Sequence, residues 1–258
     1  MGHERVGSLP RTRIWRHIVA DLARLEDGED VTISDIAHRT LKNVRKRYEG
    51  IHKDSGVQAA FGYLLSLATE RYNRAEAHHV IGLDLSENPS PVRIAAKLNA
   101  WVAAHASSTE YAEIARRAGG DTIAQWTQQR GRQDDLFEGP ADARRVWQAA
   151  SEAHGFCEVA RIFFAKFTER YLRYFLEREA SAELPSLEAR EKFSEQLSAH
   201  VDTVSQHAFE TSKIAQSFAA GWFNNHARNA HPSEREIEGF LALSFGKLQE
   251  ELQREAVQ

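Results

Sequence analysis

Cysteine is nearly absent from this sequence. Cys157 is the only cysteine among 258 residues, which excludes an internal disulfide and any zinc site built from several thiolates. Disulfides are rare where thiols are kept reduced, so this composition is typical of a cytoplasmic protein. Because Cys157 lies among Phe156, Val159 and Ala160, we expect it to be a buried and unreactive thiol.

Long hydrophobic runs are also missing. The most apolar stretch, residues 156–167, is interrupted by Glu158, Arg161 and Lys166. A membrane-spanning helix needs roughly 18 or more predominantly apolar residues, so we expect no membrane span. Residues 11–25 carry too many charges to be the core of a signal peptide.

The sequence has only 6 prolines and no segment with a convincing strand alternation, and 42% of its residues are hydrophobic. This composition is typical of a globular helical protein. We therefore predict an all-α fold. Residues 131–140 contain two glycines, a proline and an acidic pair, which is typical of a linker. They divide the chain into a predicted N-terminal helical domain, residues 1–133, and a predicted C-terminal bundle, residues 140–258.

In the N-terminal part, apolar residues at helical spacing predict helices over residues 11–25, 34–51 and 57–68. Ser34 is the expected N-cap of the second helix. Turn-forming residues in 79–91 predict a loop, and residues 94–102 predict another helix.

The C-terminal part carries the most regular pattern. Residues 141–178 are predicted to be helical, with a break near Gly155, and residues 182–186 form a turn. A heptad seam then continues, with apolar or small residues three or four apart. Its members are Phe193, Leu197, Val201, Val204, Ala208, Thr211, Ala215, Phe218 and Trp222. Such a seam after a turn predicts a long antiparallel helical hairpin. Ser233 and Glu236 form a capping box that begins the last helix.

Charge is unevenly distributed, although the net charge is only -4. Basic residues at neighbouring positions of the second helix predict a surface for phosphate or an acidic partner. They are Arg39, Lys42, Arg45, Lys46 and Arg47. An ordinary solvated helix face is the alternative interpretation.

Residues 109–130 are compatible with a helix-turn-helix whose turn is Ala118, Gly119 and Gly120. Its second helix would present Gln125, Gln129 and Arg130, side chains that can contact base edges and phosphates. A tight corner between two packed helices is the alternative.

Asn225, Arg228 and His231 form a polar cluster at a helix junction. In its placement the segment resembles the site of small all-α ribonucleases of the HEPN class, which place an arginine four to six residues before a histidine. The resemblance implies a nuclease, but only two residues separate Arg228 from His231, and Asn225 stands where the arginine would be. Arg74 and His79 have the family's spacing. A capping and packing cluster is the alternative interpretation.

Metal and nucleotide motifs are not found. His78 and His79 with Asp84, and His226 and His231 with Glu234, lack a compact zinc spacing, so we expect no metal site. No phosphate-binding loop, dinucleotide-binding glycine motif or nucleophile elbow occurs, and we expect no cofactor.

These patterns favour a noncatalytic helical subunit or adaptor of a bacterial-type multiprotein complex. We expect it to bind a protein partner or a second copy of itself, with Phe218 and Trp222 at the interface. The alternatives are a nucleic-acid-binding protein that uses the basic helix and the helix-turn-helix segment, and a small all-α HEPN-like nuclease.

Overall fold

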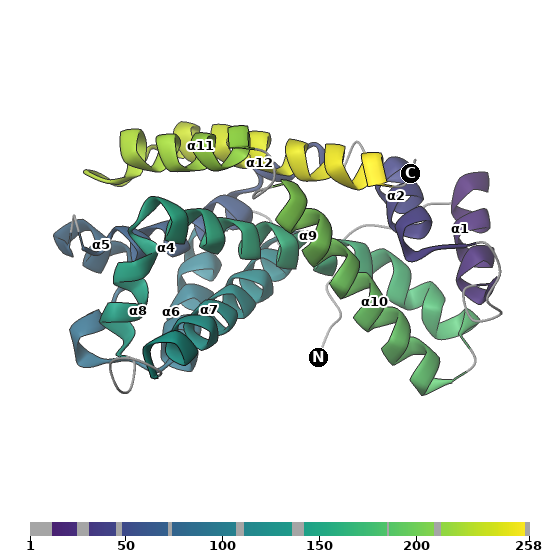
Figure 1. Ribbon diagram of the computed structural model, residues 1–258, viewed down its shortest axis with the longest axis horizontal. Coiled ribbons are helices and arrows are strands. Elements are labelled where there is room, and N and C mark those ends of the chain that lie inside the picture. The colour runs from purple at the N-terminus through teal and green to yellow at the C-terminus, as the bar shows by residue number, and fades with distance from the viewer. Residues whose placement is uncertain are drawn as a thin grey trace.

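The computed structural model describes residues 12–24, 31–44, 48–71, 74–106, 111–135, 142–184, 186–208 and 213–255. All regular structure in these ranges is helical (Figure 1), which confirms the predicted all-α class. The elements are α1 (Arg13–Arg24), α2 (Ile33–Asn43), η1 (Ile51–Lys53), α4 (Ser55–Thr69), α5 (Arg74–Ile81), η2 (Leu85–Glu87), α6 (Pro91–His105), α7 (Ala112–Asp135), α8 (Ala143–Ala150), α9 (Ala153–Glu183), α10 (Leu187–Gln206), α11 (Lys213–Trp222), the π-helical turn η4 (Phe223–Ala227) and α12 (Glu234–Glu255). None of the helices in these ranges is both long enough and apolar enough to cross a membrane.

Polar side chains cap the N-terminal ends of several of these helices. They accept hydrogen bonds from backbone N–H groups that have no partner within the helix. The predicted capping box is confirmed: the backbone N–H of Ser233 donates to Glu236 Oε2 at 2.8 Å. The backbone N–H of Glu236 in turn donates to Ser233 Oγ at 3.4 Å. Helix α2 is capped by Thr32 rather than by Ser34 as predicted, because Thr32 and Asp35 make the reciprocal box.

Helix α9 is the centre of the molecule and packs against α1, α7, α8, α10 and α11. It carries aromatic residues on more than one side, which is typical of a helix that is surrounded by others. The predicted break falls between Ala150 and Ala153, just before Gly155. A side chain at Gly155 would collide with the backbone carbonyl of Ala149, so glycine permits the close turn from α8 into α9.

Helices α9 and α10 are antiparallel. Arg161 Nη1 lies 2.8 Å from Asp202 Oδ1, and Arg173 Nη2 donates to the carbonyl of Ser194 at 3.0 Å. The first part of the heptad seam, from Phe193 to Val204, is buried in α10. Ala208 is buried just after α10, whereas Phe218 and Trp222 belong to a separate helix, α11, which runs in a different direction and also packs against α9 (Figure 1). The seam residue Thr211 and the side chain of Ala215 lie outside the described residues.

The predicted helix-turn-helix is wrong at its turn, because α7 continues as one helix through Ala118, Gly119 and Gly120. Glycine lowers intrinsic helix stability, but tertiary packing overrides that preference here. A Cβ atom at Gly119 would lie 2.7 Å from Leu98 Cδ1. The glycine therefore allows α6 to pack closely on the middle of α7.

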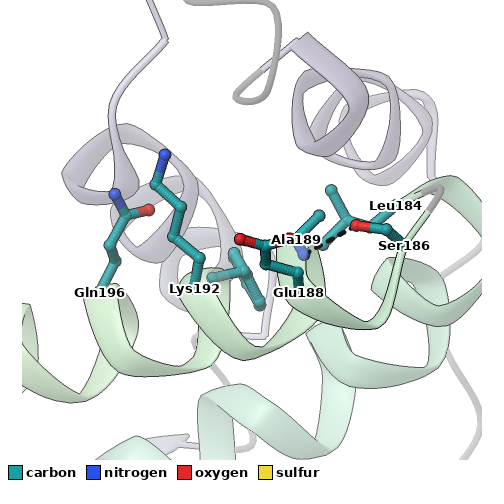
Figure 2. A pocket seen from close by; sticks show the side chains of 7 residues that line it. Leu184, Ser186, Glu188, Ala189, Lys192 and Gln196 are labelled. Carbon is teal, nitrogen blue, oxygen red and sulfur yellow. Dashed lines mark hydrogen bonds between the residues drawn. The ribbon is translucent and has the colours of Figure 1, made fainter.

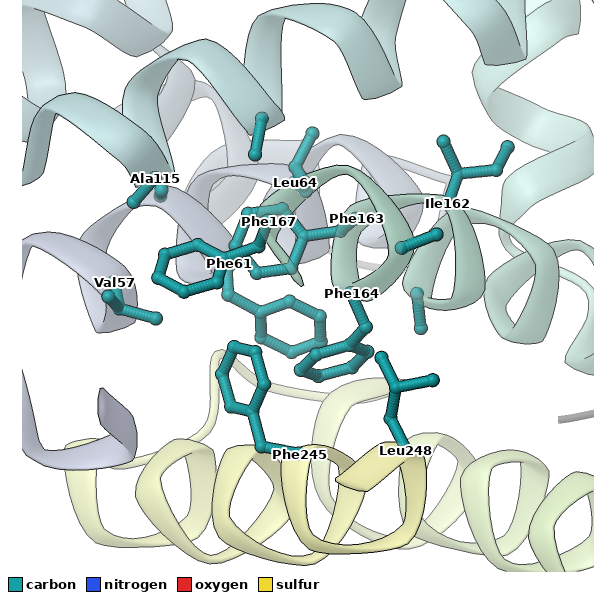
Figure 3. Packing of buried hydrophobic residues seen from close by; sticks show 14 of the residues in the cluster. Val57, Phe61, Leu64, Ala115, Ile162, Phe163, Phe164, Phe167, Phe245 and Leu248 are labelled. Carbon is teal, nitrogen blue, oxygen red and sulfur yellow. The ribbon is translucent and has the colours of Figure 1, made fainter. Parts of the chain in front are cut away.

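One hydrophobic cluster joins both sides of the predicted linker (Figure 3). The ring of Phe61 on α4 lies 5.6 Å from that of Phe164 on α9 and 5.3 Å from that of Phe240 on α12. The ring of Phe245 lies 4.8 Å from that of Phe164. These contacts bury residues from the predicted N-terminal domain directly against residues from the predicted C-terminal bundle.

Candidate functional site

Polar groups gather at the C-terminal end of α4, which is otherwise an apolar and buried helix. Gly62, Ser66 and Glu70 follow each other at intervals of four, so they lie along one side of α4 and its final turn. His231 contacts this side at Ser66, and His78 contacts it at Glu70. The two histidines thus lie over adjacent turns.

The second of these contacts belongs to a cluster of three potential ligands, Glu70, His78 and Asp84, which we call the Glu70 cluster. His78 Nε2 is 3.6 Å from Glu70 Oε1 and 3.6 Å from Asp84 Oδ1. Arg74, one turn before His78 on α5, borders the cluster. Its Nη2 atom lies 3.0 Å from each carboxylate oxygen of Asp84. The cluster therefore combines the end of α4, helix α5 and the residue that caps η2.

Hydrogen bonds keep the Asp84 carboxylate ionised. Its Oδ1 atom accepts from the hydroxyl of Ser86 at 2.7 Å and from the backbone N–H of Ser86 at 2.8 Å. These bonds, followed by the contribution of Arg74, lower the pKa of Asp84 to about 2. Asp84 is thus a fixed negative charge beside His78 at neutral pH.

Two atoms of the cluster are buried without a hydrogen bond. Glu70 is only 5% exposed, and its Oε1 atom has no hydrogen-bond partner among the described residues; neither has His78 Nε2. The 3.6 Å separations are too long for a good hydrogen bond. A buried polar atom without a partner costs about 1–3 kcal/mol and is uncommon in folded proteins.

His231 is held by the neighbouring turn. Its Nδ1 atom lies 3.2 Å from Ser66 Oγ, and its backbone N–H donates to Glu76 Oε2 at 3.0 Å. The Ser66 hydroxyl already donates to the carbonyl of Gly62, so it can accept only if His231 Nδ1 carries the proton. Burial lowers the pKa of His231, which favours the neutral imidazole, with its single proton on Nδ1.

The other members of the predicted nuclease site do not join His231. Asn225 and Arg228 are exposed at and just after η4, whereas His231 is half-buried against α4. The histidine in η4, His226, forms a separate pair with Glu236 at 2.8 Å. In the Arg74 and His79 pair, His79 is exposed and it is His78 that lies with Arg74 beside Glu70.

The predicted basic surface is described only in part. Arg39 forms an ion pair with Asp21, and Lys42 is exposed on α2. Residues 45–47, which include Arg45, Lys46 and Arg47, lie outside the described residues.

The predicted base-reading residues lie on the continuous helix α7. Gln125, Gln129 and Arg130 are half-buried there, and α7 packs against α4, α6 and α9. The guanidinium carbon of Arg130 lies 4.6 Å from the ring centre of Trp126. These residues therefore do not form the exposed second helix of a helix-turn-helix.

The predicted interface residues pack within the chain. The rings of Phe218 and Trp222 lie 5.8 Å and 4.4 Å from the ring of Phe240 on α12. Trp222 is only 8% exposed and also stacks on Phe156 of α9. In the single chain, these side chains hold α11 to α9 and α12.

A cavity of about 290 Å³ lies along α10 (Figure 2). Its polar side chains, Ser186, Glu188, Lys192 and Gln196, all come from α10 or its cap. Ser186 Oγ already accepts the backbone N–H of Ala189 at 3.0 Å and caps the helix. The Glu70 cluster is the better candidate for a ligand site, because it brings converging groups together from three segments.

The outer side of α6 is a second notable surface. Five of its exposed residues are apolar: Val92, Ala96, Ala100, Ala103 and Ala104. Four of them are spaced four apart and form one line along the helix. Val92 at the start of this line is 78% exposed. The opposite side, with Ile94, Leu98 and Val102, is buried.

Sequence reasoning missed Glu70 because it caps the end of α4, whereas His78 lies on α5. The sequence feature that could have identified Glu70 is the spacing of four residues from Glu70 to Arg74 and from Arg74 to His78. The chain matches no family model, curated protein or solved structure.

Proposed function

We propose that this protein is a noncatalytic helical subunit that docks an acidic, amphipathic helix of a partner protein on the outer side of α6. The line of exposed small residues on α6 carries this proposal. We call it the α6 stripe and define it as Val92, Ala96, Ala100 and Ala104.

Small side chains favour close helix packing, because the distance between two helix axes, about 8–10 Å, depends on the residues at the contact. The α6 stripe therefore offers a shallow apolar surface to a second helix. Ile94, Leu98 and Val102 hold α6 in the core from its other side. A surface that is already rigid loses little conformational entropy on binding.

Charge favours a different protein over a second copy of α6. Helix α6 contains no aspartate or glutamate, and it exposes Lys97, His105 and Arg93, of which Arg93 forms an ion pair with Glu87 at 3.2 Å. Two copies packed through this side would bring their Lys97 side chains together, whereas an acidic residue beside an apolar stripe would complement Lys97.

The test is affinity purification of the tagged full-length chain from its native host, with Ala100→Glu and a matched control, Ala124→Glu. Both alanines are exposed in helices, and glutamate is a good helix former, so both variants should fold. Only Ala100→Glu places bulk and negative charge in the α6 stripe.

We expect one partner to be retained by wild type and Ala124→Glu and lost by Ala100→Glu. Mixing the purified partner, or a peptide of its acidic helix, with each variant should reproduce this order of affinities. Equal binding by both variants would overturn the proposal. So would a dimer of the purified chain that Ala100→Glu dissociates, because the α6 stripe would then bind a second copy.

A further inference from the structure

We propose that Glu70, His78 and Asp84 bind a divalent first-row metal ion of the zinc type. One ligand atom from each residue lies within 4.8 Å of the other two. The three atoms come from the end of α4, from α5 and from the cap of η2, so the tertiary fold brings them together. The site lies on elements other than α6 and does not depend on the docking proposal.

Two of the three separations fit a single small ion, and the third, between the Glu70 and Asp84 oxygens, is at most 4.8 Å. Nitrogen and oxygen ligands lie about 2.1 Å from zinc, so two neighbouring ligands of a tetrahedral ion are about 3.4 Å apart. His78 Nε2 lies 3.6 Å from Glu70 Oε1 and 3.6 Å from Asp84 Oδ1. For an ion to lie between all three residues, the two carboxylates must approach each other and Arg74 must leave Asp84.

The buried atoms without a hydrogen bond provide a second and independent indication. Glu70 is 95% buried, and both its Oε1 atom and His78 Nε2 have no hydrogen bond among the described residues. A carboxylate oxygen and an imidazole nitrogen that face each other repel unless a proton or a metal ion lies between them. A bound ion would supply the missing partner to both atoms at once.

The chemistry of the ligands selects the kind of ion. Calcium and magnesium prefer sets of oxygen ligands, usually six or more, and often keep several waters. One imidazole with two carboxylates suits zinc and its neighbours in the first row. Three protein ligands would leave one tetrahedral position for water.

Arg74 competes with the ion. Its Nη2 atom lies 3.0 Å from both oxygens of Asp84, and its Nε atom lies 3.6 Å from Glu70 Oε1. The guanidinium therefore partly neutralises the two carboxylates in the absence of metal. Its side chain is nearly half exposed, so it can turn toward solvent when an ion enters. Removal of Arg74 should consequently strengthen metal binding.

The experiment is calorimetric titration of Zn²⁺ into the full-length, chelator-treated protein, with Co²⁺ absorption as a second readout. Glu70→Gln and His78→Ala each remove one ligand, and Arg74→Ala removes the competing cation. His226→Ala is the matched control, because His226 and Glu236 form a histidine–carboxylate pair without a third ligand among the described residues. Circular dichroism checks that every variant remains helical.

We expect one ion per chain, and tetrahedral Co²⁺ absorption in the wild type. Each ligand variant should bind roughly tenfold more weakly or worse. Arg74→Ala should bind more tightly, and His226→Ala should match the wild type. No binding at millimolar Zn²⁺, or equal affinity in wild type, Glu70→Gln and His78→Ala, would overturn the proposal. Loss of binding in folded His226→Ala alone would also overturn it, because the ion would then lie elsewhere.

Discussion

Replacement of Phe245 by alanine should destabilise the whole protein, because this ring joins α12 to the rest of the core. Phe245 is 3% exposed. Its ring lies 4.8 Å from that of Phe164, 5.1 Å from that of Phe167 and 5.7 Å from that of Tyr48. The substitution removes the contacts among these rings and leaves a cavity where α12 meets α9.

The magnitude follows from the burial. Truncation of a buried phenylalanine to alanine costs about 3–5 kcal/mol of unfolding free energy. For a chain of this size each kcal/mol lowers the melting temperature by about 2–4 °C, so the midpoint should fall by roughly 10 °C. Leu243→Ala is the control, since Leu243 lies on the same helix and is 38% exposed. It should cost less than about 1 kcal/mol.

The assays are thermal unfolding and urea unfolding, each followed by circular dichroism and by tryptophan fluorescence. Because Phe245 contacts Tyr48 as well as α9, we expect both signals to change in one coincident transition. Equal and small effects of Phe245→Ala and Leu243→Ala would refute the packing of α12 on α9. Two separate transitions would show that the chain unfolds as two independent parts and would contradict a shared core.

Three further predictions test local features. Gly155→Ala should destabilise the protein by about 1–3 kcal/mol in urea unfolding, because the added Cβ atom would meet a backbone carbonyl. Gly120→Ala is the control: its Cβ atom would meet open space, and the loss of glycine within a helix should stabilise the protein by about 0.5–1 kcal/mol. Burial lowers the pKa of His231 from 6.5, so the stability that this histidine contributes is present above pH 6.5 and is lost as the pH falls through the lowered pKa of the folded state. The variant His231→Gln should therefore show a smaller drop in urea midpoint between about pH 7.5 and pH 5.5 than the wild type. The pKa of His38 is also lowered, so His38 should account for part of the drop that remains. An unchanged drop would contradict this assignment. Burial raises the pKa of Cys157 from 9.0 to about 11, which lowers the fraction of reactive thiolate at about pH 8. The thiol should therefore react with an aromatic disulfide reagent roughly a hundredfold more slowly in the native protein than in urea. Equal rates would show that the thiol is accessible.

Local sequence patterns predicted helix ends and buried positions well where the interacting residues belong to the same helix. The capping box of Ser233 and Glu236 is confirmed, because both partners belong to one turn. The buried positions Phe193, Leu197 and Val201 also agree with the predicted seam, since helical spacing places them on one side of α10.

The prediction failed where packing between helices overrides a local preference. Glycine at 119 and 120 indicated a turn, but the close contact with Leu98 shows that Gly119 makes room for α6 within a continuous helix. The polar residues predicted to cluster near the last helix junction likewise do not lie together. Asn225 and Arg228 are near His231 in sequence, yet the side chains that contact His231 are Ser66 and Glu76, over 150 residues away.

The amino-acid order alone was sufficient for the helical class, for several helix ends and for much of the buried surface, because these depend on periodicity and capping within short segments. The juxtaposition of Glu70, His78 and Asp84, and the outward orientation of the small residues on α6, depended on how the helices pack. Helical periodicity shows which residues share a side of one helix, but which sides meet is set by contacts between segments that are distant along the chain.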